Sequence, residues 1–444
     1  MLEYLILSTF TGLFGGILVG LLPGIGVGSA TLIITPILVL IDPLSALFFF
    51  VAMQTTSQYF GSIPALVYGV PGEINDFPII QERKNLLDKI EVALKQTALG
   101  SLIGSVAALL LFLICMYAGN FWIYMYHYKI MGWVLGIAAV SVVVFGGTTN
   151  NKLISAALLV IGFFLGKVGY NSGTLETFGM FGIIELSTGI PIMPLAFGLL
   201  VIPNLIDSYK QKYQISQIDS PPTIHTKTEW GSILRGTLFG IIGGMVPGVT
   251  YLASTQLSYF VENKIKQFSK NRSIQAVVSS STADNAGAVS SLYTLIWLGI
   301  PITLGESLIV YLFQKKSISL NWNTFQESIV VGPWHLNVFV IFIIMFLIVN
   351  IAAFTLSWPG RQLSIKFARS LLTSNINLVI IAVVLISIVF AALESYSPLI
   401  FVIAFIIASA FGMLIKVNWI PLIIGFILQD NIQIVLYKLG ILTY

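Results

Sequence analysis

The sequence predicts an all-α integral membrane protein that crosses the bilayer many times. Apolar residues make up 57% of the chain and charged residues only 9%, whereas soluble domains carry about 25% charged residues. The mean hydropathy is +0.93. The apolar runs are continuous rather than alternating, which argues against a β-barrel, because barrel strands alternate with a period of two. This composition also excludes a disordered chain, which needs low hydrophobicity and high charge.

Apolar windows near the length that spans a bilayer predict roughly 10 to 12 membrane segments. Six windows are uninterrupted: Leu102–Ala118, Ile130–Phe145, Leu153–Leu165, Val338–Leu356, Ile376–Leu393 and Leu399–Leu414. Six others contain glycine or proline: Tyr4–Leu22, Val27–Ile41, Leu44–Phe60, Ile190–Ile206, Ile233–Val246 and Ile420–Leu439. We interpret Tyr4–Leu22 as a retained span, because it lacks the basic start and cleavage site of a signal peptide.

The remaining composition excludes several classes of function. The net charge is +4, but the bases are scattered over short loops, so no nucleic-acid surface is expected. The single cysteine, Cys115, and three histidines in separate loops offer no metal site. No phosphate-binding loop of the form G-x-x-x-x-G-K-[ST] occurs, and we expect no cofactor.

Lysine and arginine set the orientation, because they concentrate on the cytoplasmic side of a membrane protein. The segment Arg361–Arg369 carries three bases and no acid. We therefore place it and Lys416 in the cytoplasm, and Glu394 outside. The basic run from Lys264 to Arg272 is predicted to be cytoplasmic as well.

Two matched motifs divide the chain into halves. Gly12, Gly16 and Gly20 precede Pro23-Gly24, and Gly236, Gly240 and Gly244 precede Pro247-Gly248, an offset of 247 − 23 = 224. Further on, Gly69-Val70-Pro71 corresponds to Gly299-Ile300-Pro301, an offset of 301 − 71 = 230. The order and the near-equal offsets predict two structural repeats, residues 1–206 and 232–444, joined by a polar linker at 207–231.

Each motif indicates a helix that stops inside the membrane. Glycines at every fourth position let a neighbouring backbone approach closely, and Pro-Gly ends the helical hydrogen bonds. Broken backbone at membrane depth is tolerated only inside protein or beside a watery cavity. Paired breaks in two halves are typical of transporters that bind substrate near the midplane. We expect the repeats to be inverted by analogy with such proteins, although the number of spans leaves a parallel arrangement open.

Two polar stretches accompany these breaks. Gly61–Ala65, with the sequence Gly-Ser-Ile-Pro-Ala, is predicted to form a broken helix or a re-entrant tip. Its counterpart, Ser279–Gly287, is a run of small hydroxyl and amide residues. Free helix N-termini beside such residues can bind a carboxylate through backbone N–H groups.

At these residues the chain resembles the TctA family, the large membrane subunit of tripartite tricarboxylate transporters. The matching segments are Gly20–Gly26, Asp42–Ala46, Gly61–Ala65, Arg235–Gly248, Asn285-Ala286, Leu298–Pro301 and Pro421–Gly425. They run from about residue 10 to residue 430 in the family's order. The chain departs from the family where Gly69-Val70-Pro71-Gly72 replaces Asn-Thr-Pro-Gly and where Ile302 follows Pro301.

The resemblance implies a secondary transporter permease of the inner membrane rather than an enzyme. Its substrate would be a citrate-like tricarboxylate or, given the departures, a smaller carboxylate. Transport would be coupled to Na⁺ or H⁺ and would need a small TctB-like membrane subunit and a periplasmic TctC-like binding protein. A channel or a structural membrane subunit without transport is the alternative. A membrane protease is not supported, because neither Gly-x-Gly-Asp nor His-Glu-x-x-His is present.

The candidate site residues follow from the motifs. Asp284 could hold the coupling ion or only cap a helix, and Asn285 could bind either the ion or a carboxylate. Ser62 could donate to substrate or cap the broken helix. The full set of predicted substrate-binding residues is Pro23, Gly24, Gly26, Ser62, Pro64, Pro71, Gly72, Pro247, Gly248, Asn285, Gly299 and Pro301.

Overall fold

A computed structural model of residues 1–444 describes most of the chain. Outside the described residues lie 23–25, 69–75, 118–151, 171–176, 207–227, 246–250, 266–268, 374–384 and 430–444, with single residues or short groups between 192 and 205, 300 and 333, and 386 and 428. The predicted spans Ile130–Phe145, Ile376–Leu393 and Ile420–Leu439 and the linker 207–231 therefore lie wholly or mostly outside them.

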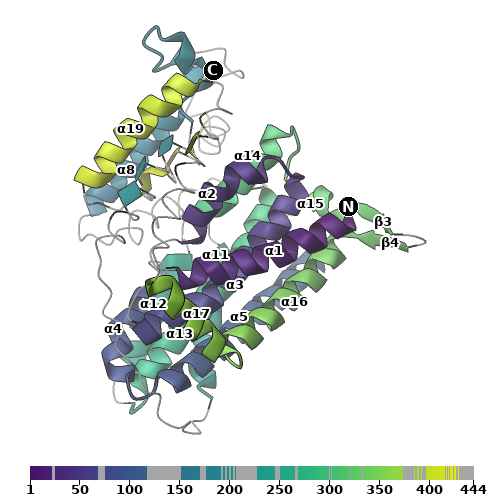
Figure 1. The fold of residues 1–444 in the computed structure, drawn as a ribbon, viewed down its shortest axis with the longest axis vertical. Coiled ribbons are helices and arrows are strands. Elements are labelled where there is room, and N and C mark those ends of the chain that lie inside the picture. Colours follow the sequence, from purple (N-terminus) through teal and green to yellow (C-terminus); the bar gives the residue numbers. More distant parts are fainter. Residues whose placement is uncertain are drawn as a thin grey trace.

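Long helices dominate the described residues and support an all-α membrane protein (Figure 1). Within the described part of the chain, three helices are long and apolar enough to cross a membrane: α1 (Leu2–Leu21), α5 (Ile90–Tyr117) and α16 (Val338–Ser357). Shorter apolar helices are α2 (Val27–Leu38), α8 (Lys152–Gly166) and α19 (Pro398–Leu414). Each agrees with a predicted window to within a few residues, except that α5 begins 12 residues earlier than its window (102 − 90 = 12).

The remaining elements are helices of mixed character and two small hairpins. α3 (Pro43–Tyr68) and α13 (Arg272–Leu298) are long but rich in polar residues. The others are α4 (Phe77–Glu82), η2 (Arg83–Leu86), η3 (Ile184–Thr188), α11 (Trp230–Met245), α12 (Tyr251–Ile265), α14 (Leu304–Lys315), α15 (Trp322–Gln326) and α17 (Arg361–Thr373). Strands β1 (Gly169–Tyr170) and β2 (Thr177–Phe178) pair antiparallel, as do β3 (Ser328–Val331) and β4 (Trp334–Asn337).

The glycine motifs bring two pairs of helices into backbone contact. A methyl group at Gly12, Gly16 or Gly20 of α1 would lie under 3.0 Å from a carbonyl oxygen of α3, those of Phe49, Met53 and Ser57 in turn. On α11, Gly236, Gly240 and Gly244 meet the α13 carbonyls of Ser279, Ala283 and Gly287 in the same way. The carbonyl partners differ by 279 − 49 = 230 residues, which is the offset found between the second pair of motifs.

Two sets of helices run in opposite directions. Helices α1 and α3 are parallel, because successive residues of α1 contact successive residues of α3. Helix α16 is parallel to α3 as well, since Phe342 meets Phe48 and Asn350 meets Tyr59. In the other set, α5 runs along α13, with Ser101 beside Asn285 and Ala108 beside Tyr293. The sets are antiparallel, because the end of α5 meets the start of α16: the Phe112 and Phe339 rings lie 5.7 Å apart.

The two halves of the chain are interlocked. Helix α5 of the first half packs on α13 and α11 of the second half, and α16 of the second half packs on α3 and α1 of the first. The short helices exchange partners too, since α4 contacts α12 and α14 contacts α2. The buried core is therefore shared by both halves.

A second group of helices contains α8 and α19, which lie together at the upper left of Figure 1. Here glycines again permit backbone contact: Gly162 of α8 meets the Leu422 carbonyl, and Gly412 of α19 meets the Gly198 carbonyl. Each of these helices thus packs on a segment from the opposite half of the chain.

Both polar stretches are helical. Gly61–Ala65 lies inside α3, which continues past Pro64 to Tyr68, and Ser279–Gly287 lies in the middle of α13. The prediction that the helix breaks at Gly61–Ala65 is therefore wrong, while the rest of the predicted re-entrant segment, residues 69–72, lies outside the described residues. Hydroxyls in α13 bond to carbonyls of their own helix, such as Thr282 to Val278 at 2.7 Å, so the polar run remains helical.

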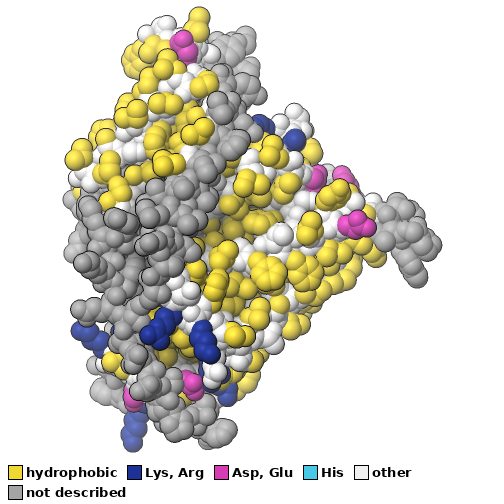
Figure 2. Space-filling model, in the orientation of Figure 1, with side chains coloured by type: hydrophobic (Ala, Val, Ile, Leu, Met, Phe, Trp, Pro, Cys, Tyr) yellow, Lys and Arg dark blue, Asp and Glu magenta, His cyan; other side chains and the backbone are white. Residues whose placement is uncertain are grey.

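Charged side chains gather at the ends of the helical bundle. Figure 2 shows hydrophobic side chains over most of the visible surface and most of the lysines and arginines toward the end that carries α4. Arg361 at the start of α17 pairs with Glu91 at the start of α5, 3.1 Å apart. Which end faces the cytoplasm stays a prediction for the Arg361–Arg369 segment, and Glu394, Lys416 and Lys266 lie outside the described residues.

Candidate functional site

The two polar helices cross at the centre of the bundle. Gln58 of α3 lies beside the backbone carbonyl of Asp284 in α13, with Nε2 3.5 Å from that oxygen. Around this contact the side chains are small or amide-bearing, yet most are buried. Polar groups that are buried away from water need hydrogen-bond partners. We call the buried and half-buried polar side chains where α3, α5 and α13 meet the polar seam: Gln54 and Gln58 of α3, Ser101 of α5, and Asp284 and Asn285 of α13.

Asn285 forms the best-defined part of the polar seam. Its side chain is fully buried, and Nδ2 donates to Ser101 Oγ at 2.8 Å and to the Ser281 carbonyl at 3.1 Å. The carbonyl can only accept, so the amide cannot be turned over. Oδ1 consequently has no partner among the described residues, at a cost of about 1–3 kcal/mol if nothing binds there.

Gln54 is the second unsatisfied amide of the polar seam. It is 2% exposed, and neither Nε2 nor Oε1 has a hydrogen-bond partner among the described residues. It lies one helical turn from Gln58 on the same face of α3. By the offset of the second motif pair, 284 − 54 = 230, it occupies the position of Asp284. The free donor and acceptor atoms of Gln54 and the free acceptor of Asn285 could be satisfied by a ligand or by ordered water.

The other predicted site residues fall in three places. Ser62 and Pro64 are buried in α3, where the Ser62 hydroxyl donates to the Tyr59 carbonyl, 3.1 Å away. Asp284 is half-buried in α13. Gly26 precedes α2, Gly299 ends α13 with φ of +63°, and Pro301 is buried before α14. Pro23, Gly24, Pro71, Gly72, Pro247 and Gly248 lie outside the described residues.

In each half, a buried carboxylate follows the Gly-x-Pro motif and lies against one of the central helices. Glu306 of α14 is fully buried and completes a capping box with Thr303, and one of its oxygens accepts from Ser291 Oγ at 2.5 Å. Asp76, before α4, is 9% exposed and lies over Gly61 of α3. These positions are equivalent, because 306 − 76 and 291 − 61 both equal 230.

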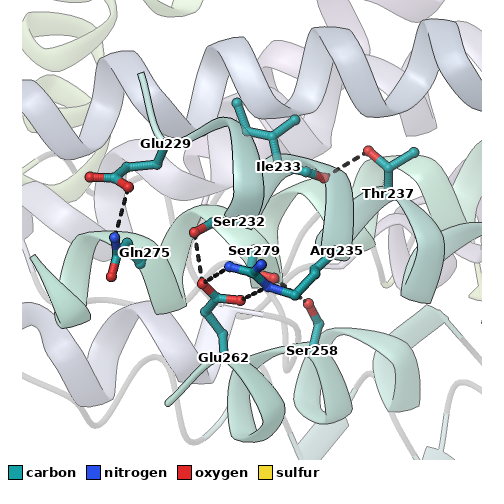
Figure 3. A network of polar contacts seen from close by, with 9 residues as sticks. All are labelled: Glu229, Ser232, Ile233, Arg235, Thr237, Ser258, Glu262, Gln275 and Ser279. Atoms are coloured by element: carbon teal, nitrogen blue, oxygen red, sulfur yellow. Dashed lines mark hydrogen bonds and ion pairs between the residues drawn. The ribbon is translucent and has the colours of Figure 1, made fainter. Parts of the chain in front are cut away.

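A second polar network joins α11 to α12 at the basic end (Figure 3). Arg235 donates to both oxygens of Glu262, at 2.6 and 2.7 Å, and Ser232 donates to Glu262 at 2.7 Å. The Glu262 carboxylate is buried, and Arg235 is partly exposed. Ser258 and Ser279, 2.7 Å apart, extend the network to α13. It has no ionic counterpart at the equivalent residues, Thr11 and Leu38.

The end of α3 is held by α4 and η2. Arg83 donates to the Leu66 and Val67 carbonyls at 3.0 and 2.9 Å, which satisfies two of the carbonyls that a helix end leaves free. Glu82 is buried and accepts from the Tyr259 hydroxyl of α12 at 2.8 Å. The hairpin after α3 is therefore fixed to the opposite half of the chain.

The described residues contain no group of three or more histidine, cysteine, aspartate or glutamate side chains that could hold a metal ion. None of the described lysines or arginines is buried. An anionic ligand in the polar seam would therefore meet amides, hydroxyls and helix backbone rather than basic side chains.

Sequence reasoning missed Gln54, Ser101, Asp76 and the burial of Glu306. The offset of 230 could have revealed three of them, since it pairs Gln54 with Asp284 and Asp76 with Glu306. No sequence signal pointed to Ser101, because its role depends on α5 crossing to the other half.

Comparison with known proteins identifies one family. The chain matches the family model described as the tripartite tricarboxylate transporter TctA family over residues 6–424. It is also 29% identical over 328 residues to an uncharacterized 52.8 kDa protein in the TAR-I ttuC' 3' region of Agrobacterium vitis. That match covers 70% of this chain and 64% of the relative, so the chain spans less than two thirds of that relative's length. No solved structure matches the chain.

Proposed function

Because the chain belongs to the tripartite tricarboxylate transporter TctA family, whose model matches residues 6–424, we propose that it is a secondary transporter permease for an organic carboxylate. The polar seam is the observation that carries this proposal. Two buried polar helices cross there with unsatisfied amides at Gln54 and Asn285. Unsatisfied buried groups of this kind need a ligand or ordered water.

We propose that the chain is built from two inverted repeats. The matched contacts of α1 with α3 and of α11 with α13 support this, as do the opposite directions of the two sets. In inverted-repeat transporters the substrate binds at the interface of the repeats, and access alternates when one part moves against another. We propose that the polar seam lies at that interface. The predicted Pro-Gly breaks would then complete the site on each side.

The substrate proposed for the polar seam is a citrate-like or smaller carboxylate. Gln54 Nε2 and nearby hydroxyls would donate to its carboxylate oxygens, and Asn285 Oδ1 would accept from a hydroxyl group of the substrate. Since no described lysine or arginine is buried, a co-bound cation would balance the negative charge. We propose Na⁺ or H⁺ as this cation and the predicted residues Asp284 and Asn285 as candidates for binding it.

The family implies a three-part system, so we propose a small membrane subunit and a periplasmic binding protein as partners in the inner membrane. Reconstituting this chain with and without a small TctB-like membrane subunit would test the requirement. Accumulation only with both membrane subunits supports it, and full activity of this chain alone contradicts it.

Uptake by cells or vesicles tests the function. We expect saturable, gradient-dependent accumulation of labelled carboxylate, which Asn285→Ala abolishes while the protein stays in the membrane. Gln54→Leu should raise the KM for substrate at least tenfold. Thr237→Ala is a suitable control, because that hydroxyl bonds only within its own helix. Unchanged uptake by Asn285→Ala would contradict the site, and ion conductance far above transporter turnover would instead indicate a channel.

A further inference from the structure

Helix α17 (Arg361–Thr373) begins just after the membrane-crossing helix α16 ends. Helix α16 has 20 residues and is about 30 Å long, which is the thickness of the hydrocarbon core of a bilayer. Its exposed side chains are apolar, except for Thr355, as far as Leu356. A turn at Trp358 and Gly360 follows, and tryptophan is enriched at membrane–water boundaries. This places the start of α17 at a membrane surface.

Hydrogen bonds and an ion pair hold α17 in one orientation on the bundle. The Tyr68 hydroxyl at the end of α3 donates to the Ile365 carbonyl at 3.0 Å. The Ser364 hydroxyl donates to a carbonyl in the last turn of α16 at 3.1 Å. Arg361 pairs with Glu91 of α5 at 3.1 Å. Because these contacts come from three different helices, the side of α17 that faces away from the bundle is fixed.

Apolar and basic side chains separate on the exposed surface of α17. The side chains buried against the bundle repeat at the spacing of one helix face and are Ser364, Ala368 and Leu371. Successive residues of a helix are turned by about 100°, so Leu363 and Phe367 lie along one side of this buried stripe, and both are exposed. Gln362 and Arg369 lie toward its other side and Lys366 lies opposite it, all of them exposed. The helix therefore has an apolar edge and a basic edge.

The charge that α17 presents outward is positive. The helix has three basic residues and no acidic one. Arg361 is paired with Glu91 and lies over the Trp358 ring, 4.3 Å from its centre, so Lys366 and Arg369 carry the exposed charge. A helix with basic residues on one side and leucine or phenylalanine on another is typical of helices that lie in the plane of a membrane interface and are attracted to anionic lipids.

We propose that α17 lies in the membrane interface and binds anionic lipid headgroups through Lys366 and Arg369, with Leu363 and Phe367 among the acyl chains. Charge complementarity favours an anionic lipid over a zwitterionic one. The position of α17 directly after a helix with an apolar exposed side favours lipid over a protein partner. Because Tyr68 is bonded to α17, bound lipid also stabilises the end of α3, the helix that carries Gln54 and Gln58 of the polar seam. The proposal does not depend on which substrate is transported.

Melting of the purified full-length protein in a neutral detergent tests the headgroup contact. Phosphatidylglycerol is added in steps, and phosphatidylcholine and inorganic phosphate serve as comparisons. We expect phosphatidylglycerol alone to raise the melting temperature, because a ligand that binds only the folded state stabilises it. Lys366→Glu should lose at least half of this shift. Lys316→Glu, at the end of α14, is the matched control, since it makes the same charge change at another exposed lysine and should keep the shift.

Spin labels on the two edges of α17 test its depth in the membrane. The single cysteine, Cys115, is replaced by serine, and Leu363→Cys or Gln362→Cys is then labelled with a nitroxide in vesicles that contain phosphatidylglycerol. These neighbours in the sequence are both exposed but lie about 100° apart around the helix. We expect oxygen, which concentrates among acyl chains, to relax the label at 363 more strongly. A water-soluble nickel chelate should relax the label at 362 more strongly.

Several outcomes would overturn the proposal. A wild-type phosphatidylglycerol shift in Lys366→Glu would exclude the headgroup contact, and an equal shift with inorganic phosphate would indicate a simple anion site. Equal access of the chelate to both labels would place α17 in water, and shielding of both labels from both reagents would mean that a protein partner covers it. Each shift is measured from the variant's own melting temperature without lipid, and the labels leave Lys366 unchanged, so a poorly folding variant cannot decide the result. None of these measurements needs transport activity.

Discussion

The first and second halves of the chain build the same helix pair with different chemistry. In both, three glycines on one helix meet three backbone carbonyls on the second helix after it, and the short helix that follows this second helix packs on the opposite half. The second half adds an ion pair between the partly exposed Arg235 and the buried Glu262, where the first half has Thr11 and Leu38. In the second half the carboxylate of Glu306 forms part of the cap of α14, whereas the equivalent carboxylate of the first half, Asp76, does not cap α4.

This comparison distinguishes the contacts that both halves share from those that only one half makes. Backbone contact through glycine occurs in both halves, so it belongs to the shared architecture. Among the described residues of the two matched helix groups, the ion pair and the capping box occur in the second half only, where both fasten helices to one another. We infer that the second half is held more firmly and that the first half presents the more adaptable groups to ligands.

The ion pair offers the largest effect. Arg235→Met leaves the buried Glu262 carboxylate without its cation, which should destabilise the protein by about 3 kcal/mol. The double variant Arg235→Thr with Glu262→Leu copies the first half and should recover most of the loss. Thermal melting of purified protein checks both. If the double variant is as unstable as the single one, the two helix pairs are not interchangeable.

The glycine contacts should give the next largest effect, and it should be equal in the two halves. Gly16→Ala and Gly240→Ala each force a methyl group to under 3.0 Å from a carbonyl oxygen, and overpacking of this kind costs about 1–3 kcal/mol. Yield of folded protein and melting temperature measure the loss, with Gly15→Ala as the tolerated control. A loss confined to one half would show that the contacts are not equivalent.

Much of this comparison could be predicted from the sequence, because glycine spacing reports backbone contact directly. Val338–Leu356 and Leu399–Leu414 were confirmed as helices, since uniform apolar runs have one stable form in lipid. Gly61–Ala65 was wrongly predicted as a break, because Pro64 removes one backbone donor and buried packing keeps the helix intact. The polar seam could not be predicted, because its partners on α3, α5 and α13 meet only through the exchange between halves.

The helix caps should give the smallest effect and the sharpest contrast. Thr303→Ala removes the cap of α14 and should cost about 1 kcal/mol. Asp76→Asn at the equivalent turn removes no helix cap, so its cost should be smaller than that of Thr303→Ala. Thermal melting of the purified variants compares the two losses. Equal losses would mean that Asp76 caps α4 in solution, so that Asp76 and Glu306 would not differ in their capping role.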